Sequence, residues 1–248
     1  MQTKGLPFSL YRTHRSLSMQ ASYAAASDIG AHHAAAWLVK VDLLGAFPTF
    51  EDKARALVTY PRVRLGNDNL GLCKLPWVDV FNPESLKREG DIYINPATQE
   101  LYADFYNGML GTRLTWQEIF EHTDRDINLQ RVMNALHYGA ATGGQDRIPD
   151  RAVGPTEDAL YELERDFNDR QLASFMDKPV EEIQKMPVGE KREALLRFRR
   201  QELDKLLQAY YEERGWNQNG IPKVETLQSL GLWDFLTDEA KAFLTAQA

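Results

Sequence analysis

The sequence of 248 residues contains one cysteine, Cys73. A single thiol excludes an internal disulfide framework and a metal centre built from several cysteines of this chain, and it is typical of proteins in a reducing compartment. No apolar run approaches the length that spans a membrane, and the segment Met1–Pro7 lacks the apolar core of a signal peptide. We therefore expect a soluble, cytoplasmic protein without a membrane span.

Positive charge is also scarce. The chain has 29 Lys and Arg against 36 Asp and Glu, a net charge of -7, and no run rich in Lys and Arg. Because nucleic-acid-binding proteins neutralise phosphates with clustered basic side chains, we expect no nucleic-acid partner. His-Glu-x-x-His, a nucleophile elbow and a phosphate-binding loop are absent too. Any chemistry would then take place at a site completed by another polypeptide.

Alternating strand patterns are rare, and the longest is Asp91–Ile94. Apolar residues recur instead at helical spacing, so we expect an all-α fold, an irregular multi-helix domain. The capping box of Thr115 and Glu118 marks one helix start, and Leu101, Phe105 and Leu110 supply the apolar side of the helix before it. The expected helices start at Met19, at Ser27 or Asp28 (through residue 40), at Phe50 (ended by Pro61), and near residues 96, 116, 157, 190, 224 and 237.

The chain is expected to form one continuous domain with two parts. Residues 1–150 form a helical part that faces a cofactor and carries a His-His helix and a D-x-x-G-L-C turn. Residues 151–248 form a charged helical insertion and the C-terminal helices, and the loop 142–149 between them is flexible and polar. Four arginines of the insertion suggest either an anion site or a solvated face, and the interleaved acidic residues favour the solvated face. These are Arg192, Arg197, Arg199 and Arg200.

Two short stretches concentrate reactive side chains. In 68–74 a carboxylate, Asp68, lies five residues before the thiol of Cys73, with Gly71 between them. The thiol is either a metal ligand or a buried structural cysteine. The second stretch holds His32 and His33, which would point about 100° apart on a helix, so that only one faces a given site. A buried, hydrogen-bonded histidine is the alternative here.

Four ordered segments resemble the tungsten-containing aldehyde:ferredoxin oxidoreductase family, which includes the related benzoyl-CoA reductase catalytic subunits. The resemblance covers 27 to about 232 and is more specific than any single motif. The segments are Ser27-Asp28-Ile29-Gly30-Ala31-His32-His33, Asp68-Asn69-Leu70-Gly71-Leu72-Cys73-Lys74, Tyr102-Ala103-Asp104-Phe105-Tyr106-Asn107 with Leu114-Thr115-Trp116, and Tyr210-Tyr211-Glu212-Glu213-Arg214-Gly215-Trp216-Asn217-Gln218-Asn219-Gly220-Ile221-Pro222.

The resemblance implies a fold like the C-terminal helical domain of that family, and two cofactors. These are a tungsten bis-molybdopterin (tungstopterin) and a [4Fe-4S] cluster. By similarity, Cys73 is the last ligand of the cluster, and Lys74 tunes the cluster by its charge. Asp68 and the backbone at Gly71 and Leu72 would hydrogen-bond one pterin.

The same resemblance makes His33 the histidine beside the metal that exchanges a proton with substrate, whereas His32 occupies a position that is often cysteine in the family. The implied activity is oxidation of aldehydes to carboxylic acids with ferredoxin-type acceptors. A low-potential reduction of an aromatic acyl-CoA is the alternative within the family. A non-catalytic helical interaction subunit is the alternative outside it.

The part of the family that carries the pterin-binding domain and three further cluster cysteines is not found in these residues. The chain is then either one half of a split enzyme or a truncated or separately expressed piece of it. The split enzyme is the hypothesis that we favour, with an N-terminal partner chain that shares both cofactors and with ferredoxin or another electron-transfer subunit as a second partner. The charged region 155–200 is either a docking surface for a redox partner or a solvated insertion.

Overall fold

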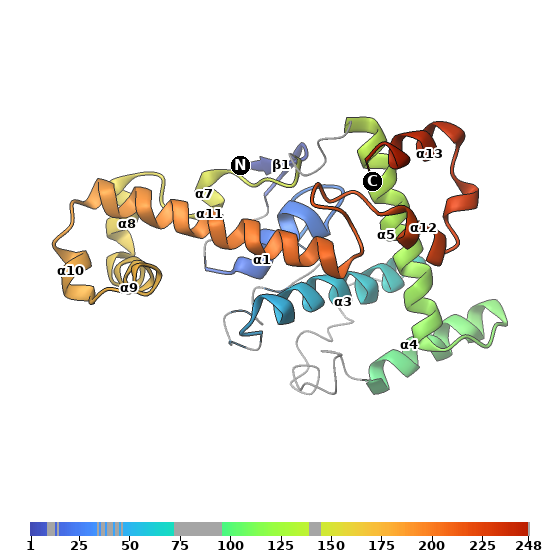
Figure 1. Ribbon diagram of the computed structural model, residues 1–248. Helices are drawn as coiled ribbons and strands as arrows, with labels where there is room; N and C mark the ends of the chain where they lie inside the picture. The colour runs from blue at the N-terminus through green and yellow to red at the C-terminus, as the bar shows by residue number, and fades with distance from the viewer. Residues whose placement is uncertain are drawn as a thin grey trace.

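A computed structural model describes residues 1–8, 13, 15–33, 35, 38, 42, 45, 47–71, 96–138 and 145–247. Helices dominate these residues, and the only strands among them form one antiparallel hairpin in which Gln2 pairs with Pro7 and Thr3 with Leu6. The expected all-α class is therefore confirmed. The ribbon is elongated, with the long helix α11 running along it and smaller groups of helices at its two ends (Figure 1).

The elements follow one another in a simple order. They are β1 (Gln2–Thr3), β2 (Leu6–Pro7), α1 (Leu17–Ala21), the π-helical η1 (Ser22–Ala26), α3 (Phe50–Asn69), α4 (Pro96–Leu110), α5 (Trp116–Tyr138), α7 (Asp150–Val153), α8 (Asp158–Leu163), α9 (Arg165–Met176), α10 (Val180–Gln184), α11 (Val188–Glu213), α12 (Val224–Ser229), η4 (Trp233–Phe235) and α13 (Asp238–Thr245).

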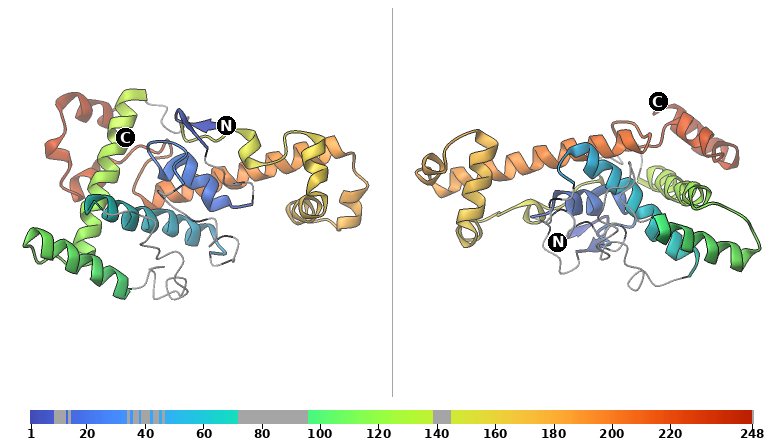
Figure 2. Two further views of the ribbon diagram at one scale, coloured as in Figure 1. Left: turned by 180° about the vertical axis from the view of Figure 1, so that it is seen from behind. Right: turned by 90° about the horizontal axis from the view of Figure 1, so that it is seen from below.

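The main core lies where α11 packs along α3, with α1 and η1 against both helices. The small residues of η1, Ala24–Ala26, are buried and let the neighbouring helices approach closely. The two further views show the same arrangement, with α8–α10 at one end of α11 and α5, α12 and α13 at the other (Figure 2). No helix in the described part of the chain is both long and apolar enough to cross a membrane.

The prediction that Pro61 ends the helix beginning at Phe50 is wrong, because α3 continues to Asn69. Proline removes the backbone donor that would pair with the carbonyl four residues earlier, here that of Leu57. At the next carbonyl, that of Val58, the Nη2 of Arg214 donates a hydrogen bond of 3.2 Å, which ties this turn of α3 to the segment after α11. Packing of α3 against α11 and α5 therefore outweighs the local cost of the proline.

The helix expected from Ser27 or Asp28 through residue 40 is also wrong, because residues 27–33 form turns and bends. Gly30 has φ +106°, and an added Cβ would lie 2.2 Å from the carbonyl oxygen of Thr3. The Nζ of Lys4 donates hydrogen bonds to the carbonyls of Ala24 and Ser27, at 2.8 and 3.2 Å. In a continuing helix these carbonyls would accept from backbone N–H groups instead. Contacts with the N-terminal hairpin therefore keep residues 27–33 out of a helical conformation.

The helix α5 begins as expected. The backbone N–H of Thr115 donates to the Glu118 carboxylate at 2.7 Å, and the N–H of Glu118 donates to Thr115 Oγ1 at 3.3 Å. The preceding helix, α4, packs on α5 through Tyr102 and Ala103, which are buried. Its expected apolar side is exposed instead, with 43–64% of each of the following residues accessible. They are Leu101, Phe105, Met109 and Leu110.

Candidate functional site

A cavity of about 170 Å³ lies between the turn 27–33, the second half of α3, and α5. His32 and Asp68, two residues singled out in the sequence, both line it. Three charged or polar residues that the sequence did not single out line it as well: Arg64, Gln130 and Asp28. The structure therefore brings together His32 and Asp68, which lie 36 positions apart in the chain.

His32 lies in an irregular segment and His33 in the turn that follows, so neither is on a helix. Their rings stack, with centroids 5.8 Å apart and planes inclined by 28°. The two imidazoles therefore lie beside each other, but only His32 lines the cavity. Burial lowers the pKa of His33 below its ordinary value of 6.5, so that its imidazole is neutral at pH 7.

Asp68 lies in the last turn of α3, and its carbonyl accepts the N–H of Gly71 at 2.9 Å. Gly71 adopts φ +68°, and a Cβ at this position would meet no atom within 4 Å. The positive φ favours glycine, and the open surroundings leave the backbone accessible. The other predicted site residues, Leu72, Cys73 and Lys74, lie outside the described residues.

A cluster of buried charged side chains anchors residues 27–33, which carry the two histidines, through Asp28. The guanidinium of Arg131, on α5, contacts Asp146 through both terminal nitrogens and also reaches the Asp28 carboxylate at 3.3 Å. The Nζ of Lys4 lies 2.9 Å from Asp146, and none of the four side chains is more than 5% exposed. Asn134 adds a hydrogen bond to the carbonyl of Asp28 at 2.9 Å.

The charges of this cluster stabilise one another. Burial alone would lower the pKa of Arg131, but the carboxylates of Asp146 and Asp28 outweigh it and raise that pKa. Burial alone would raise the pKa of Asp146, but Arg131 and Lys4 outweigh it and lower that pKa. Arg131 and Asp146 are therefore both charged at pH 7. In the loop 142–149, which was expected to be flexible and polar, residues 142–144 lie outside the described residues, and Asp146 and Ile148 are buried.

The C-terminal signature segment completes the support of the site. Arg131 donates to the carbonyl of Gly220 at 2.7 Å, and its guanidinium lies 4.7 Å from the ring centroid of Trp216. The hydroxyl of Tyr211 donates to Asp146 at 2.6 Å. The signature residues therefore act here through packing and hydrogen bonds to the cluster.

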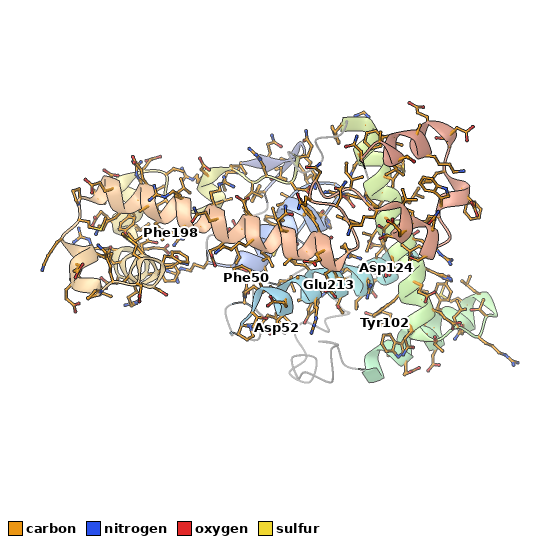
Figure 3. All side chains as sticks on the ribbon, in the orientation of Figure 1. Phe50, Asp52, Tyr102, Asp124, Phe198 and Glu213 are labelled. Carbon is orange, nitrogen blue, oxygen red and sulfur yellow. The ribbon has the colours of Figure 1, made fainter. Side chains whose placement is uncertain are left out.

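A second buried contact ties the same segment to α3 and α5. The carboxylate of Asp124 accepts from Arg62 and from Arg214, each at 2.8 Å. Figure 3 shows Asp124 on α5, close to the end of α11 at Glu213. The Nε1 of Trp216 donates to Asn128 on the same helix at 2.9 Å. These contacts fix α5, and with it Gln130 and Arg131, relative to α3.

The side chains at the cavity fit one edge of a nitrogen-rich heterocycle better than they fit a metal ion. Ser27 is buried, lines the cavity, and its Oγ has no hydrogen-bond partner among the described residues. Asp68 and Asp28 accept hydrogen bonds, Arg64 donates them, and Gln130 does both. No three His, Cys, Asp or Glu side chains gather as a metal-ligand set in the described ranges. A metal here would take its ligands from elsewhere.

The fold and the cavity define a class of protein: a mainly helical domain with a cavity lined by polar side chains between its helices, in the part of the chain that the structure describes. The family model for aldehyde ferredoxin oxidoreductase, domains 2 and 3, matches residues 1–232, and the chain belongs to this family. Its members are oxidoreductases known for tungsten or molybdenum pterins and iron–sulfur clusters. The expected family is thereby confirmed. Comparison with individually curated proteins gives no significant match.

Proposed function

We propose that this chain is the helical part of a tungsten-bispterin, iron–sulfur oxidoreductase that oxidises aldehydes to carboxylic acids and passes the electrons to ferredoxin-type acceptors. The observation that carries the proposal is the cavity on which His32 and Asp68 meet, in a chain of this family. In this proposal residues 1–150 face the cofactors and residues 151–248 form the charged and C-terminal helices.

The residues of the chain have distinct roles in the proposal. Asp68 would accept hydrogen bonds from N–H groups of the pterin, and backbone groups at Gly71 and Leu72 would hydrogen-bond the same pterin. Cys73 supplies the last thiolate of the cluster, and the ammonium of Lys74 stabilises added electrons. The bound tungsten pterin supplies the two-electron redox chemistry. Its other ligands come from polypeptide outside these 248 residues.

In this proposal His33 is the base that accepts a proton released when the aldehyde is oxidised. Oxidation of an aldehyde with water to a carboxylic acid releases two electrons and two protons, so a base beside the substrate is needed. Burial keeps the imidazole of His33 neutral, and a neutral imidazole accepts a proton. His32, stacked on His33, fixes the orientation of its ring.

The exposed apolar side of α4 supports a partner surface. Met109 and Leu110 are 64% and 58% exposed, and both line a cavity of about 340 Å³ that also contains Asn69 and Leu70 at the end of α3. An apolar surface beside the proposed cofactor turn suits contact with the polypeptide that supplies the remaining ligands.

The proposal is tested on the complex isolated with this chain. We expect tungsten and iron to co-purify with it, together with a second polypeptide segment that carries cysteines. Aldehydes should reduce a viologen dye in its presence. Oxidation of reduced viologen by an aromatic acyl-CoA, without aldehyde activity, would support the alternative reaction. A metal-free, active chain would disprove the proposal.

Replacing His33 by glutamine is expected to lower kcat of this complex by about 100-fold or more, because general base catalysis contributes at least that factor. Tungsten and iron contents should stay unchanged, since His33 holds neither. His137→Gln, on the exposed end of α5, serves as the matched control and should retain full activity. Equal activity of the two variants would remove His33 from the mechanism.

The pH dependence provides a further prediction for His33. Its pKa in the folded state lies below 6.5, so kcat/KM should fall only at a pH below 6.5, as the imidazole takes up a proton. In the unfolded chain the same group takes up its proton nearer pH 6.5. Stability should therefore decline as the pH falls from 6.5 towards the folded-state pKa. Denaturant titrations of the wild type and His33→Gln should show a smaller decline in the variant.

A further inference from the structure

A second cavity, of about 250 Å³, lies at the other end of α3, between α1, α9 and α11. Lys53 on α3 lines it, whereas Asp68, fifteen residues further along the helix, lines the proposed cofactor cavity. At 1.5 Å per residue the two cavities are about 22 Å apart along the helix axis. The proposed oxidoreductase function leaves the second cavity without a role.

The expectation of a solvated arginine face on α11 is wrong at this cavity. Arg199 is only 3% exposed and lines the cavity wall. Its hydrogen bonds go to neutral oxygens: Gln171 Oε1 at 2.6 and 2.9 Å, Asn168 Oδ1 at 2.9 Å, and the Val153 carbonyl at 3.4 Å. A buried guanidinium without a contacting carboxylate is costly.

A second guanidinium faces the same space. The Cζ of Arg15 lies 4.6 Å from the ring centroid of Phe167, and the Cζ of Arg199 lies 5.8 Å from the same centroid. Arg15 also lines the cavity. Burial, together with the charge of Arg15, lowers the pKa of Arg199 to about 10, although Glu164 acts in the opposite direction. Two guanidiniums thus line one cavity, in which a single anion would contact both.

Each carboxylate that lines the cavity already forms an ion pair with a lysine. Asp42 contacts Lys53 and also accepts from the hydroxyl of Ser16 and the N–H of Ser18. Glu202 contacts Lys205 at 2.9 Å. Arg15 contacts Glu164 at 2.8 Å but keeps 45% of its side chain exposed. Arg199 is the cavity cation whose charge no such contact balances among the described residues.

A buried hydrogen-bond acceptor in the cavity wall indicates that the ligand carries a hydroxyl as well as a negative charge. Gln20 is 3% exposed and lines the cavity, and its Nε2 donates to the carbonyl of Thr13 at 3.0 Å. Its Oε1 has no hydrogen-bond partner in the described part of the chain. The missing partner is a donor, so an anion that fits both arginines and Gln20 carries at least one hydroxyl.

We propose that this cavity binds a phosphate group, with Arg15 and Arg199 contacting its charged oxygens and Gln20 Oε1 accepting a hydrogen bond from its hydroxyl. Guanidinium forks match tetrahedral oxyanions. Hydrogen phosphate keeps one O–H at neutral pH, whereas sulfate and carboxylates have none. The ligand is inorganic phosphate, or a small phosphate monoester whose alcohol part carries a further hydroxyl.

The test uses the full chain in low-salt buffer without phosphate, with isothermal titration calorimetry and thermal unfolding as readouts. We expect inorganic phosphate to bind with Kd below about 1 mM, to raise Tm, and to bind at least tenfold more tightly than sulfate. Glycerol phosphate, titrated in parallel, identifies the source. Tighter binding of the ester assigns a phosphate monoester, and tighter binding of the free ion assigns inorganic phosphate.

Substitutions in and near the cavity test whether phosphate binds there. Arg15→Ala, at a largely exposed side chain, should weaken phosphate binding at least tenfold, and Glu164→Gln should leave it unchanged or strengthen it. Arg170→Ala removes the same charge from an exposed position of α9 that does not line the cavity, and should have no effect. Gln20→Leu should abolish the preference for phosphate over sulfate. Absent binding, binding that Arg15→Ala leaves intact, or equal affinity for sulfate would overturn the proposal.

Discussion

Replacing Arg131 by methionine is expected to lower the free energy of unfolding by about 3–5 kcal/mol, because it leaves two carboxylates, Asp146 and Asp28, buried with one cation fewer. Methionine keeps much of the apolar volume, so the loss reports the charge and its hydrogen bonds. Denaturant titration measures the change directly.

The matched control is Arg125→Met on the same helix. Arg125 is exposed and donates a single hydrogen bond to the carbonyl of Leu230. We expect this control to lose about 1 kcal/mol or less. Combining Arg131→Met with Asp146→Asn should cost less than the sum of the two single changes, since the two side chains share one interaction. A loss below about 1 kcal/mol for Arg131→Met would contradict the role assigned to the cluster.

Replacing Gly30 by alanine is expected to destabilise the protein by about 2–5 kcal/mol. The new Cβ would lie 2.2 Å from the carbonyl oxygen of Thr3 and 2.9 Å from the Cβ of Leu6, at φ +106°. Steric overlap and the positive φ each cost about 1–3 kcal/mol. Because this turn carries His32 and His33, the oxidoreductase activity of the complex should fall as well.

Gly45→Ala separates the two costs. Gly45 also has a positive φ, +69°, but a Cβ there would meet no atom of the described residues within 4 Å. This variant should therefore lose only about 1–2 kcal/mol, the cost of the left-handed conformation itself. Equal losses at the two glycines would show that the close contact between the hairpin and the histidine turn does not exist in solution.

The features predicted well from the sequence depend on neighbouring residues. The capping box at Thr115 specifies the start of α5 through contacts within four residues, so the local pattern suffices. The end of α3 was missed because Pro61 is a strong local signal, whereas the packing against α11 and the donor from Arg214 come from far along the chain. Local patterns cannot reveal such partners.

The candidate site shows the same division. Asp68 and the two histidines could be recognised from short segments that resemble the family, and the structure brings His32 and Asp68 to one cavity. Arg131 and Asp146 could not be recognised, since each lies in a segment without a motif and only the folded chain brings them together. A buried charge in a polar loop gives no signal in hydrophobic periodicity.

The N-terminal hairpin takes part in contacts between distant parts of the chain. The hydroxyl of Thr3 donates to the carbonyl of Arg147, 144 residues later, and Arg131 donates to the carbonyl of Gly220, 89 residues later. Contacts between such distant parts of a chain close large loops and form slowly. The turn that carries the two histidines lies against this hairpin, so it should become fixed late in folding, after the segments around Arg147 and Gly220 have reached it.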